Sequence, residues 1–234
     1  MFYGEVTWNL LLMLLCYAYV ILVIFISGKL PATLGVSQKT SRKFLHAMIG
    51  NLPFVIPFFT ANIYPVLVAA PFILVTFLAS PFSPLKRSKF EGLANITEKG
   101  HPLGLVLYAI SYTLLALFFA SEPYVVAAGI LPMAYGDSAA SLVGGTYGKR
   151  RYSFLANKSL EGSIAMLAVS LLSLSIGLVF FSGYYSFQVP NVILATLAVV
   201  TVTTLAESVS PKGFDNLTVP ILGALVFFLL VRGV

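Results

Sequence analysis

The segment from Gly136 to Ser163 places acids, bases and glycines between two strongly apolar stretches. Asp137 and Glu161 lie at the inner ends of these stretches, and four cations separate them: Lys149, Arg150, Arg151 and Lys158. Ionisable side chains at membrane depth are costly, so they usually mark a functional site. Carboxylates can bind Mg²⁺, and cations neutralise the charge of phosphate groups. Glycines let the backbone approach a bound phosphate closely. This combination favours a site for a metal-bound polyphosphate. The alternative is a positively charged loop between two helix-end acids.

Arg42, Lys43 and His46 form a second polar group, which Ser41 precedes as a predicted N-cap. Spacings of three and four residues place the three side chains on one helical face, with His46 about one turn inside the membrane. This pattern indicates that Arg42 and Lys43 bind phosphate groups and that His46 is a hydrogen-bonding partner. A basic flank at a membrane boundary, together with a polar contact between helices, explains the same residues.

A third polar group runs from Glu207 to Pro220. Glu207 ends one apolar stretch, Asp215 and Asn216 begin the next, and Pro220 interrupts the backbone hydrogen bonding of the helix that follows. Helix capping explains Asp215 and Asn216, which are good N-cap residues, but it does not explain Glu207. Four acids and several cations are thus expected on one membrane face.

Two helix ends can be predicted around the first group. Gly144 and Gly145 are expected to end the helix that carries Asp137 with a left-handed cap. Asn157 or Ser159 is expected to cap the next helix, with Glu161 in its first turn. The glycine-rich run that ends at Lys149 is not a phosphate-binding loop of the Walker type, because its glycine spacing differs and Arg150 follows the lysine.

Composition decides the protein class. The chain of 234 residues is 59% hydrophobic and 9% charged, whereas soluble domains average about 25% charged residues. Long continuous apolar runs indicate membrane helices and exclude a membrane β-barrel. The single cysteine, Cys16, excludes a disulfide framework. The net charge of +6 is spread over short loops with few aromatic residues, so it suits lipid headgroups or phosphates and not nucleic acid.

The apolar pattern predicts an all-α polytopic membrane helix bundle with about eight transmembrane helices. The predicted spans are 7–27, 43–60, 63–80, 102–120, 123–144, 160–181, 190–207 and 217–232. We expect one integral membrane domain over 1–234, with its active-site segments 41–51, 136–163 and 207–220 on the cytoplasmic face. The polar stretch 81–101 is expected to form a surface helix or a lid.

Charge predicts the orientation. Thirteen of the 14 basic residues fall in alternate loops on one side, and Arg232 falls opposite. The positive-inside rule places these loops in the cytoplasm and both termini outside. We therefore expect a multi-pass protein of a prokaryotic plasma membrane, or of the endoplasmic reticulum or another organelle membrane.

Over roughly residues 40 to 220, these segments resemble the CTP-dependent dolichol kinase and phytol kinase family, which is related to CTP-dependent diacylglycerol kinases and CDP-diacylglycerol synthases. The resemblance is carried by Arg42-Lys43-x-x-His46-x-x-x-Gly50, Gly136-Asp137-x-x-Ala140-x-x-x-Gly144, Lys158-Ser159-x-Glu161-Gly162-Ser163 and Glu207-x-x-Ser210-Pro211-x-Gly213-x-Asp215-Asn216-Leu217-Thr218-Val219-Pro220. Gly104-x-x-x-Tyr108 also looks like the family's helix after its long loop. Thr146 departs from the basic residue that relatives often carry, which weakens the phosphate assignment of its loop.

The resemblance implies a lipid kinase that uses CTP and Mg²⁺ and accepts a long-chain isoprenoid alcohol, such as dolichol, phytol or geranylgeraniol, from the bilayer. It implies catalytic roles for Asp137, Glu161 and Asp215, and metal binding by these three and Glu207. It implies nucleotide or phosphate binding by a larger set: Arg42, Lys43, His46, Gly144, Lys149, Lys158 and Asn216. No nucleic acid is implied as a partner, and the motifs do not specify the alcohol.

Three other functions stay open. A cytidylyltransferase that makes a CDP-lipid needs the same cations, Mg²⁺ and lipid entrance, and so does a CTP-dependent diacylglycerol kinase. A small transporter would also hold charges within its spans. Transporters usually place such charges near the midplane of repeated halves, whereas here the acids cluster at one interface and no repeat is visible.

Overall fold

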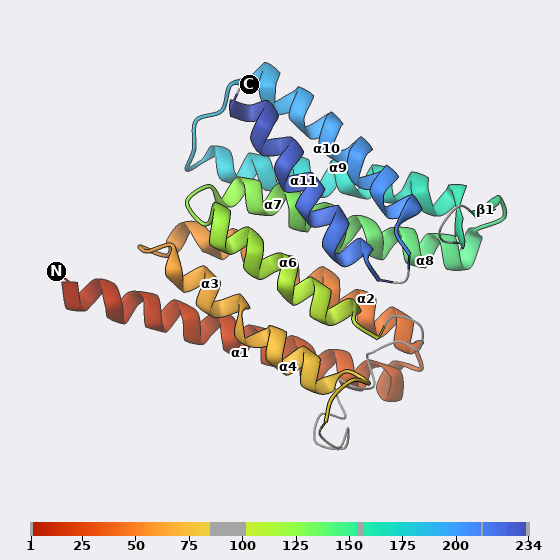
Figure 1. Ribbon diagram of the computed structural model, residues 1–234, viewed down its shortest axis with the longest axis horizontal. Helices are drawn as coiled ribbons and strands as arrows, with labels where there is room; N and C mark the ends of the chain where they lie inside the picture. The colour runs from red at the N-terminus through yellow and green to blue at the C-terminus, as the bar shows by residue number, and fades with distance from the viewer. Residues whose placement is uncertain (1, 85–101, 154–156, 212, 233–234) are drawn as a thin grey trace.

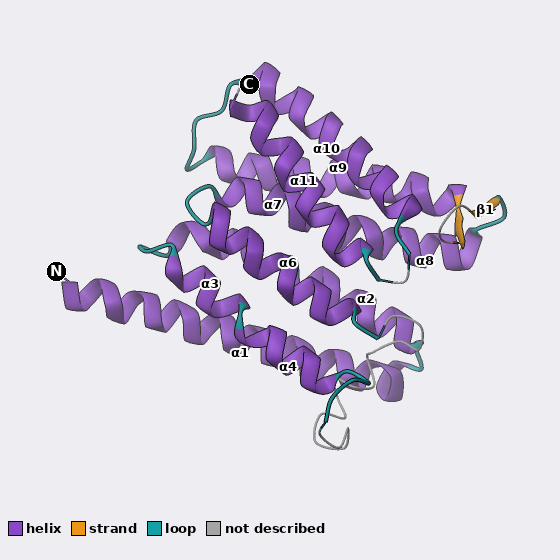
Figure 2. Cartoon of the chain, viewed as in Figure 1, coloured by secondary structure: helices purple, strands orange, loops and turns teal. Residues whose placement is uncertain are grey.

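The computed structural model describes residues 2–84, 102–153, 157–211 and 213–232, and these residues form a helical bundle with one small hairpin (Figures 1 and 2). The strands β1 (Arg151–Ser153) and β2 (Asn157–Ser159) pair antiparallel, with Tyr152 opposite Lys158. The all-α membrane class is confirmed, and the hairpin is a small addition to it. Most of the predicted surface helix or lid, 85–101, lies outside the described residues.

The elements follow the predicted spans closely. In chain order they are α1 (Phe2–Leu34), α2 (Gln38–Ile49), the 3₁₀-helix η1 (Leu52–Phe58), α3 (Ile63–Ala69), α4 (Pro71–Ala79), α6 (Gly104–Phe119), α7 (Pro123–Leu131), the π-helical turn η3 (Pro132–Gly136), α8 (Asp137–Tyr147), α9 (Leu160–Ser182), α10 (Val189–Val209) and α11 (Asp215–Arg232).

Within the described residues, five helices are long and apolar enough to cross a membrane: α1, the continuous segment Pro123–Tyr147, α9, α10 and α11. Two shorter apolar segments, Ile63–Ala79 and Gly104–Phe119, correspond to two further predicted spans. The one predicted span that remains, 43–60, is formed by α2 and η1 in succession. The number of eight crossings stays a prediction.

The segment Pro123–Tyr147 is the central helix of the bundle. Of its most apolar window 78% is buried, against 22–39% for the other four long helices. Both faces of α7 are covered, because Val125, Val126 and Ile130 are fully buried, as expected for a helix that is apolar all round. The helices α6, α9 and α11 pack against it, while α1 leaves Leu14 and Ile21 exposed on an outer, lipid-facing surface.

A π-helical turn interrupts this central helix directly before Asp137. Pro132 has no N–H to donate and its ring crowds the preceding turn, so the regular α-helical ladder cannot continue through it. The N–H of Asp137 instead bonds the carbonyl of Pro132, five residues earlier. Gly136 in this turn lies against α9, where an added Cβ would come within 2.1 Å of Ser170 Oγ. Single π-turns of this kind are frequent at functional sites.

Two predicted helix boundaries are wrong. Ser37, not Ser41, caps α2: its hydroxyl accepts from the N–H of Thr40 at 3.1 Å, and Ser41 bonds the carbonyl of Ser27 from inside the helix. Gly144 and Gly145 do not end α8, which continues to Tyr147. Gly144 is required for close packing, because a Cβ there would lie 2.8 Å from Ser159 Oγ and 3.4 Å from the Cα of Gly162 in α9. The predicted cap of α9 by Ser159 is confirmed.

The chain ends share one end of the bundle. Figure 1 shows N and C on the left, and α8 and the hairpin at the opposite end. This arrangement fits an even number of crossings, and which membrane face the hairpin occupies stays a prediction.

Candidate active site

A cavity of about 460 Å³ opens between α2, α8, the hairpin and the junction of α10 with α11. All three predicted active-site segments contribute to its wall. Five cations and three acids of the described residues line it: Lys39, Arg42, Lys43, Arg151, Lys158, Asp137, Glu207 and Asp215. The wall is completed by small and polar residues: Ala140, Ser141, Gly144, Gly145, Asn157, Ser159, Gly162, Ser163 and Ser210. The predicted convergence of distant polar groups is thus present.

Lys43 and Asp137 form an ion pair on the buried side of the cavity. Lys43 is 5% exposed and Asp137 is 2% exposed. The hydroxyl of Ser138 donates to the carbonyl of Lys43 at 3.1 Å, which ties α8 to α2 beside the pair. Two charges this deeply buried are tolerated because each neutralises the other, and removing one partner leaves an uncompensated charge that costs about 3–5 kcal/mol.

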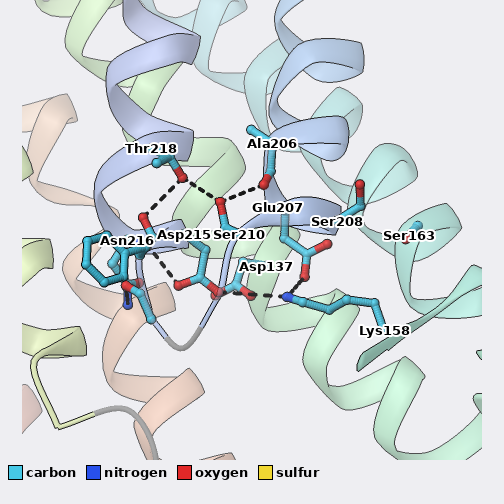
Figure 3. Close-up of polar contacts among 12 residues, drawn as sticks. Asp137, Lys158, Ser163, Ala206, Glu207, Ser208, Ser210, Asp215, Asn216 and Thr218 are labelled. Carbon is cyan, nitrogen blue, oxygen red and sulfur yellow. Dashed lines mark hydrogen bonds and ion pairs between the residues drawn. The ribbon is translucent and has the colours of Figure 1, made fainter. Parts of the chain in front are cut away.

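Lys158 is the cation around which the remaining acids gather. It forms an ion pair with Glu207, and its Nζ lies 3.9 Å from Asp215 Oδ2. Figure 3 shows its side chain extending toward Glu207, with Asp137 and Asp215 beside the ammonium group. Burial alone would lower the pKa of Lys158, but the negative charges of Glu207, Asp137 and Asp215 raise it by more. The pKa therefore lies above its ordinary value, and the ammonium group stays charged.

The turn between α10 and α11 holds Asp215 in place. Gly213 adopts a φ of +90°, which favours glycine. Ser210 bonds the carbonyl of Ala206 at 2.6 Å and the hydroxyl of Thr218 at 2.7 Å, so it links the two helices (Figure 3). The side-chain amide of Asn216 donates to the carbonyl of Gly213 at 3.2 Å. Asn216, predicted to bind nucleotide, is therefore placed to hold the turn and is not part of the cavity wall.

Glu161 is not brought together with the other three acids. Its carboxylate accepts the N–H of Arg150 at 3.2 and 3.3 Å, and it is not part of the cavity wall. One residue along a helix rotates a side chain by about 100°, so the wall takes Gly162 and Ser163 from this turn. Lys149 is likewise exposed on the loop and not part of the wall. The structure therefore places Glu161 against the backbone of Arg150, and its catalytic and metal-binding roles stay predictions.

Lys39 and Arg151 line the cavity, although the resemblance implied a phosphate-binding role for neither of them. Lys39 precedes Lys43 by four residues on α2, so the helical spacing that grouped Arg42 with His46 also indicated it. For Arg151, the sequence does not predict a position in the cavity wall, because that position depends on the hairpin that β1 forms with β2. In β1, the hydroxyl of the neighbouring Tyr152 bonds Ser163 at 2.6 Å.

The carboxylates of this wall suit Mg²⁺ by their chemistry. Mg²⁺ prefers oxygen ligands and is usually bound by one or two carboxylates together with substrate phosphates, not by a protein cage. In the part of the chain that the structure describes, no three His, Cys, Asp or Glu side chains converge as a ready-made metal site. Asp137, Glu207 and Asp215 can therefore contribute ligands, with phosphate oxygens supplying the rest.

Comparison with known proteins finds relatives by sequence. No family model and no solved structure matches the chain. The phytol kinase of Synechocystis sp. is 40% identical over 129 residues, which are 54% of each chain. A protein named probable phytol kinase 1, chloroplastic, from Glycine max is 30% identical over 202 residues, which are 82% of this chain and 67% of that one.

The chain belongs to the phytol kinase family. The family includes a farnesol kinase, chloroplastic, of Arabidopsis thaliana, which is 29% identical over 130 residues. The resemblance inferred from the polar motifs is thereby confirmed. This phytol kinase family member spans about half the length of the cyanobacterial relative and two thirds of the soybean one.

Proposed function

We propose that this chain is a kinase that transfers the γ-phosphoryl group of CTP to the hydroxyl of a long isoprenoid alcohol. The observation that carries the proposal is the cavity in which Lys43 and Lys158 are already paired with buried acids. Such a wall suits a polyphosphate with its metal, and it lies at one end of an apolar bundle that lipid can surround. The names of the relatives favour phytol or farnesol over dolichol as acceptor.

The cations of the cavity supply charge neutralisation, which dominates catalysis of phosphoryl transfer. Lys43 and Lys158 exchange their carboxylate partners for phosphate oxygens when the nucleotide binds, and Arg42, Lys39 and Arg151 add charge along the same wall. Gly145 leaves room for the phosphates to approach the backbone of α8, because the nearest atom to an added Cβ there is Lys39 Nζ at 3.8 Å.

Asp137, Glu207 and Asp215 are the residues that would hold Mg²⁺, which would neutralise the charge of the phosphates. In the reaction the alcohol oxygen bonds to the γ-phosphorus, the bond from that phosphorus to the bridging oxygen breaks, and CDP leaves. The hydroxyl proton passes to a carboxylate of this group. We assign that role, or metal binding, to Asp137, which begins α8 and lines the cavity.

Position-specific labelling of CTP tests the proposal. Membranes that contain the protein are expected to transfer label from γ-labelled CTP, and none from α-labelled CTP, to phytol or geranylgeraniol in a Mg²⁺-dependent manner. Asp137→Asn membranes are the control. Label from the α position would identify a cytidylyltransferase, and transfer to diacylglycerol alone would identify a different lipid kinase. Solute flux in vesicles without any transfer would identify a transporter.

A further inference from the structure

A second, apolar groove lies between α1, α2, α4 and α6. Its volume is about 70 Å³, and its lining includes Val20, Ile24, Leu45, Ile49, Phe72 and Ala109. The three hydroxyl-bearing side chains in the wall belong to Thr76, Tyr108 and Tyr112. Thr76 bonds the carbonyl of Phe72 at 2.6 Å and Tyr108 bonds that of His46 at 3.1 Å. The hydroxyl of Tyr112 has no partner among the described residues, so it is the one polar group of the three that is open to a ligand. Buried water needs two to four polar partners, so this wall suits a hydrocarbon and not water.

Helix α2 separates this groove from the polar cavity. Leu45 and Ile49 line the groove, whereas Lys39, Arg42 and Lys43 of the same helix line the cavity. A ligand with an apolar chain and one polar end could therefore contact both sites across a single helix.

His46 lies within this partition. It is 1% exposed, and its ring lies over that of Tyr108, a groove residue, with the centroids 4.7 Å apart. Lys43, three residues earlier on α2, pairs with Asp137. Neither ring nitrogen of His46 has a hydrogen-bond partner among the described residues. Buried polar atoms are seldom left without partners, so these nitrogens indicate a ligand that supplies one.

We propose that the isoprenoid chain of the acceptor occupies the groove between α1, α2, α4 and α6, and that His46 binds its hydroxyl group. This inference rests on the proposed function for the identity of the acceptor. The hydroxyl is then held between the groove and Asp137, so His46 serves the alcohol and not the nucleotide phosphates.

The length of the groove fits one end of such a chain. Its wall on α6 runs from Leu105 to Tyr112, which is about 10 Å of helix. The rest of a long isoprenoid would extend into the bilayer between the outer helices, where α1 exposes Leu14, Leu15 and Ile21. A narrow groove of this kind accepts a single chain, which argues against a two-chain diacylglycerol as occupant.

Photo-crosslinking tests the binding site without requiring turnover. A geranylgeraniol that carries a diazirine on its chain is irradiated with the full-length protein in vesicles, and labelled peptides are identified by mass spectrometry. We expect label on α6 around Tyr108 to Tyr112 that excess geranylgeraniol abolishes. Label on the exposed face of α9 around Ala168 should not be competed. Competed label only at helices outside the groove would overturn the inference even if phosphorylation occurs, whereas competed groove label without phosphorylation of any alcohol would overturn the kinase function alone.

A matched pair of substitutions tests the groove by kinetics. Ala109→Leu fills it, and one or more methylenes in an apolar pocket change specificity by roughly tenfold or more. We therefore expect the KM for geranylgeraniol to rise about tenfold, with the KM for CTP unchanged. Ala168→Leu makes the same change on a lipid-facing surface of α9 and should behave as the unmodified protein. Equal kinetics of the two variants would contradict the assignment.

The role of His46 is tested by comparing the KM for the alcohol with the affinity for CTP. His46→Leu should raise the KM for the alcohol and lower kcat while CTP affinity, measured by equilibrium binding, stays unchanged. His46→Gln keeps a hydrogen-bonding group and should recover part of the loss. Weaker CTP binding with an unchanged KM for the alcohol would instead return His46 to the phosphate site and overturn its proposed role.

Discussion

At the scale of single residues, the site is a set of acids paired with lysines. Asp137 depends on Lys43, and Glu207 and Asp215 share Lys158. Each pair is stable without a nucleotide, yet each lysine is also the natural partner of a phosphate. The same charges therefore contribute to folding and to the proposed chemistry, and substitutions must be designed to separate the two effects.

Asp137→Asn should lower kcat/KM by at least about 10² because a carboxylate at the reacting centre is lost. It also leaves Lys43 buried without its partner, which destabilises the protein. The double variant Asp137→Asn, Lys43→Met should recover thermal stability in detergent but not activity. Recovery of both in the double variant would show that the pair is purely structural.

Glu161→Gln should have a much smaller effect than Glu207→Gln. The amide oxygen of glutamine can still accept the N–H of Arg150, so we expect activity to change by less than about tenfold. Glu207 is 3% exposed and pairs with Lys158, so its neutralisation should lower activity far more. Initial rates at saturating CTP and alcohol provide the comparison. A loss at Glu161 equal to that at Asp137 would restore its predicted catalytic role.

At the scale of elements, the π-turn of the central helix sets the direction of Asp137. The turn is packed tightly, since an added Cβ at Gly136 would lie 2.1 Å from Ser170 Oγ and 2.9 Å from Met166 Sδ. The close fit of α9 against this turn brings the hairpin, and with it Lys158, over the start of α8.

Gly136→Ala should lower stability by about 1–3 kcal/mol, the usual cost of overpacking, and should lower activity through the displaced turn. Ser170→Ala removes one of the two crowding atoms and should partly restore both properties in the double variant. Gly4→Ala is the control, because nothing lies within 4 Å of its added Cβ. Thermal unfolding in detergent and initial rates measure the effects. An unaltered Gly136→Ala protein would show that the turn can relax without loss.

At the scale of the whole molecule, α8 and the hairpin lie at the opposite end of the bundle from the chain termini (Figure 1), and residues of both line the polar cavity. This polarity gives the proposed reaction a defined membrane face. The nucleotide is soluble and the alcohol is not, so the cavity must open to water while the groove opens to lipid.

Cysteine labelling tests the orientation. In a Cys16→Ser background, a cysteine at Arg150 should react only with reagent on the cytoplasmic face, as the positive-inside rule predicts. A cysteine at Ser186, in the exposed turn at the other end, should react only from outside. Reversed labelling would place the proposed kinase on the outer face.

The sequence by itself determined the membrane class, the approximate spans and the three polar segments of the site. These properties are local: a long apolar run is stable only in lipid or in a core, and an acid within it, such as Glu207, is costly wherever the chain folds. The spacings of Arg42 and of Lys43 to His46 could be interpreted in the same way, because helical periodicity fixes which residues three or four apart share a face.

Only the tertiary structure decided which charges meet. Asp137 and Lys43 are 94 residues apart in the chain and Lys158 and Glu207 are 49 apart, and no local preference links them. Glu161 lies in the first turn of α9, as predicted. Its carboxylate nevertheless accepts the N–H of Arg150, because its position on the helix directs it away from the cavity. The surroundings of His46 likewise depend on the packing of α6, which places the ring of Tyr108 against it. Side-chain environments are set by packing and not by sequence spacing alone.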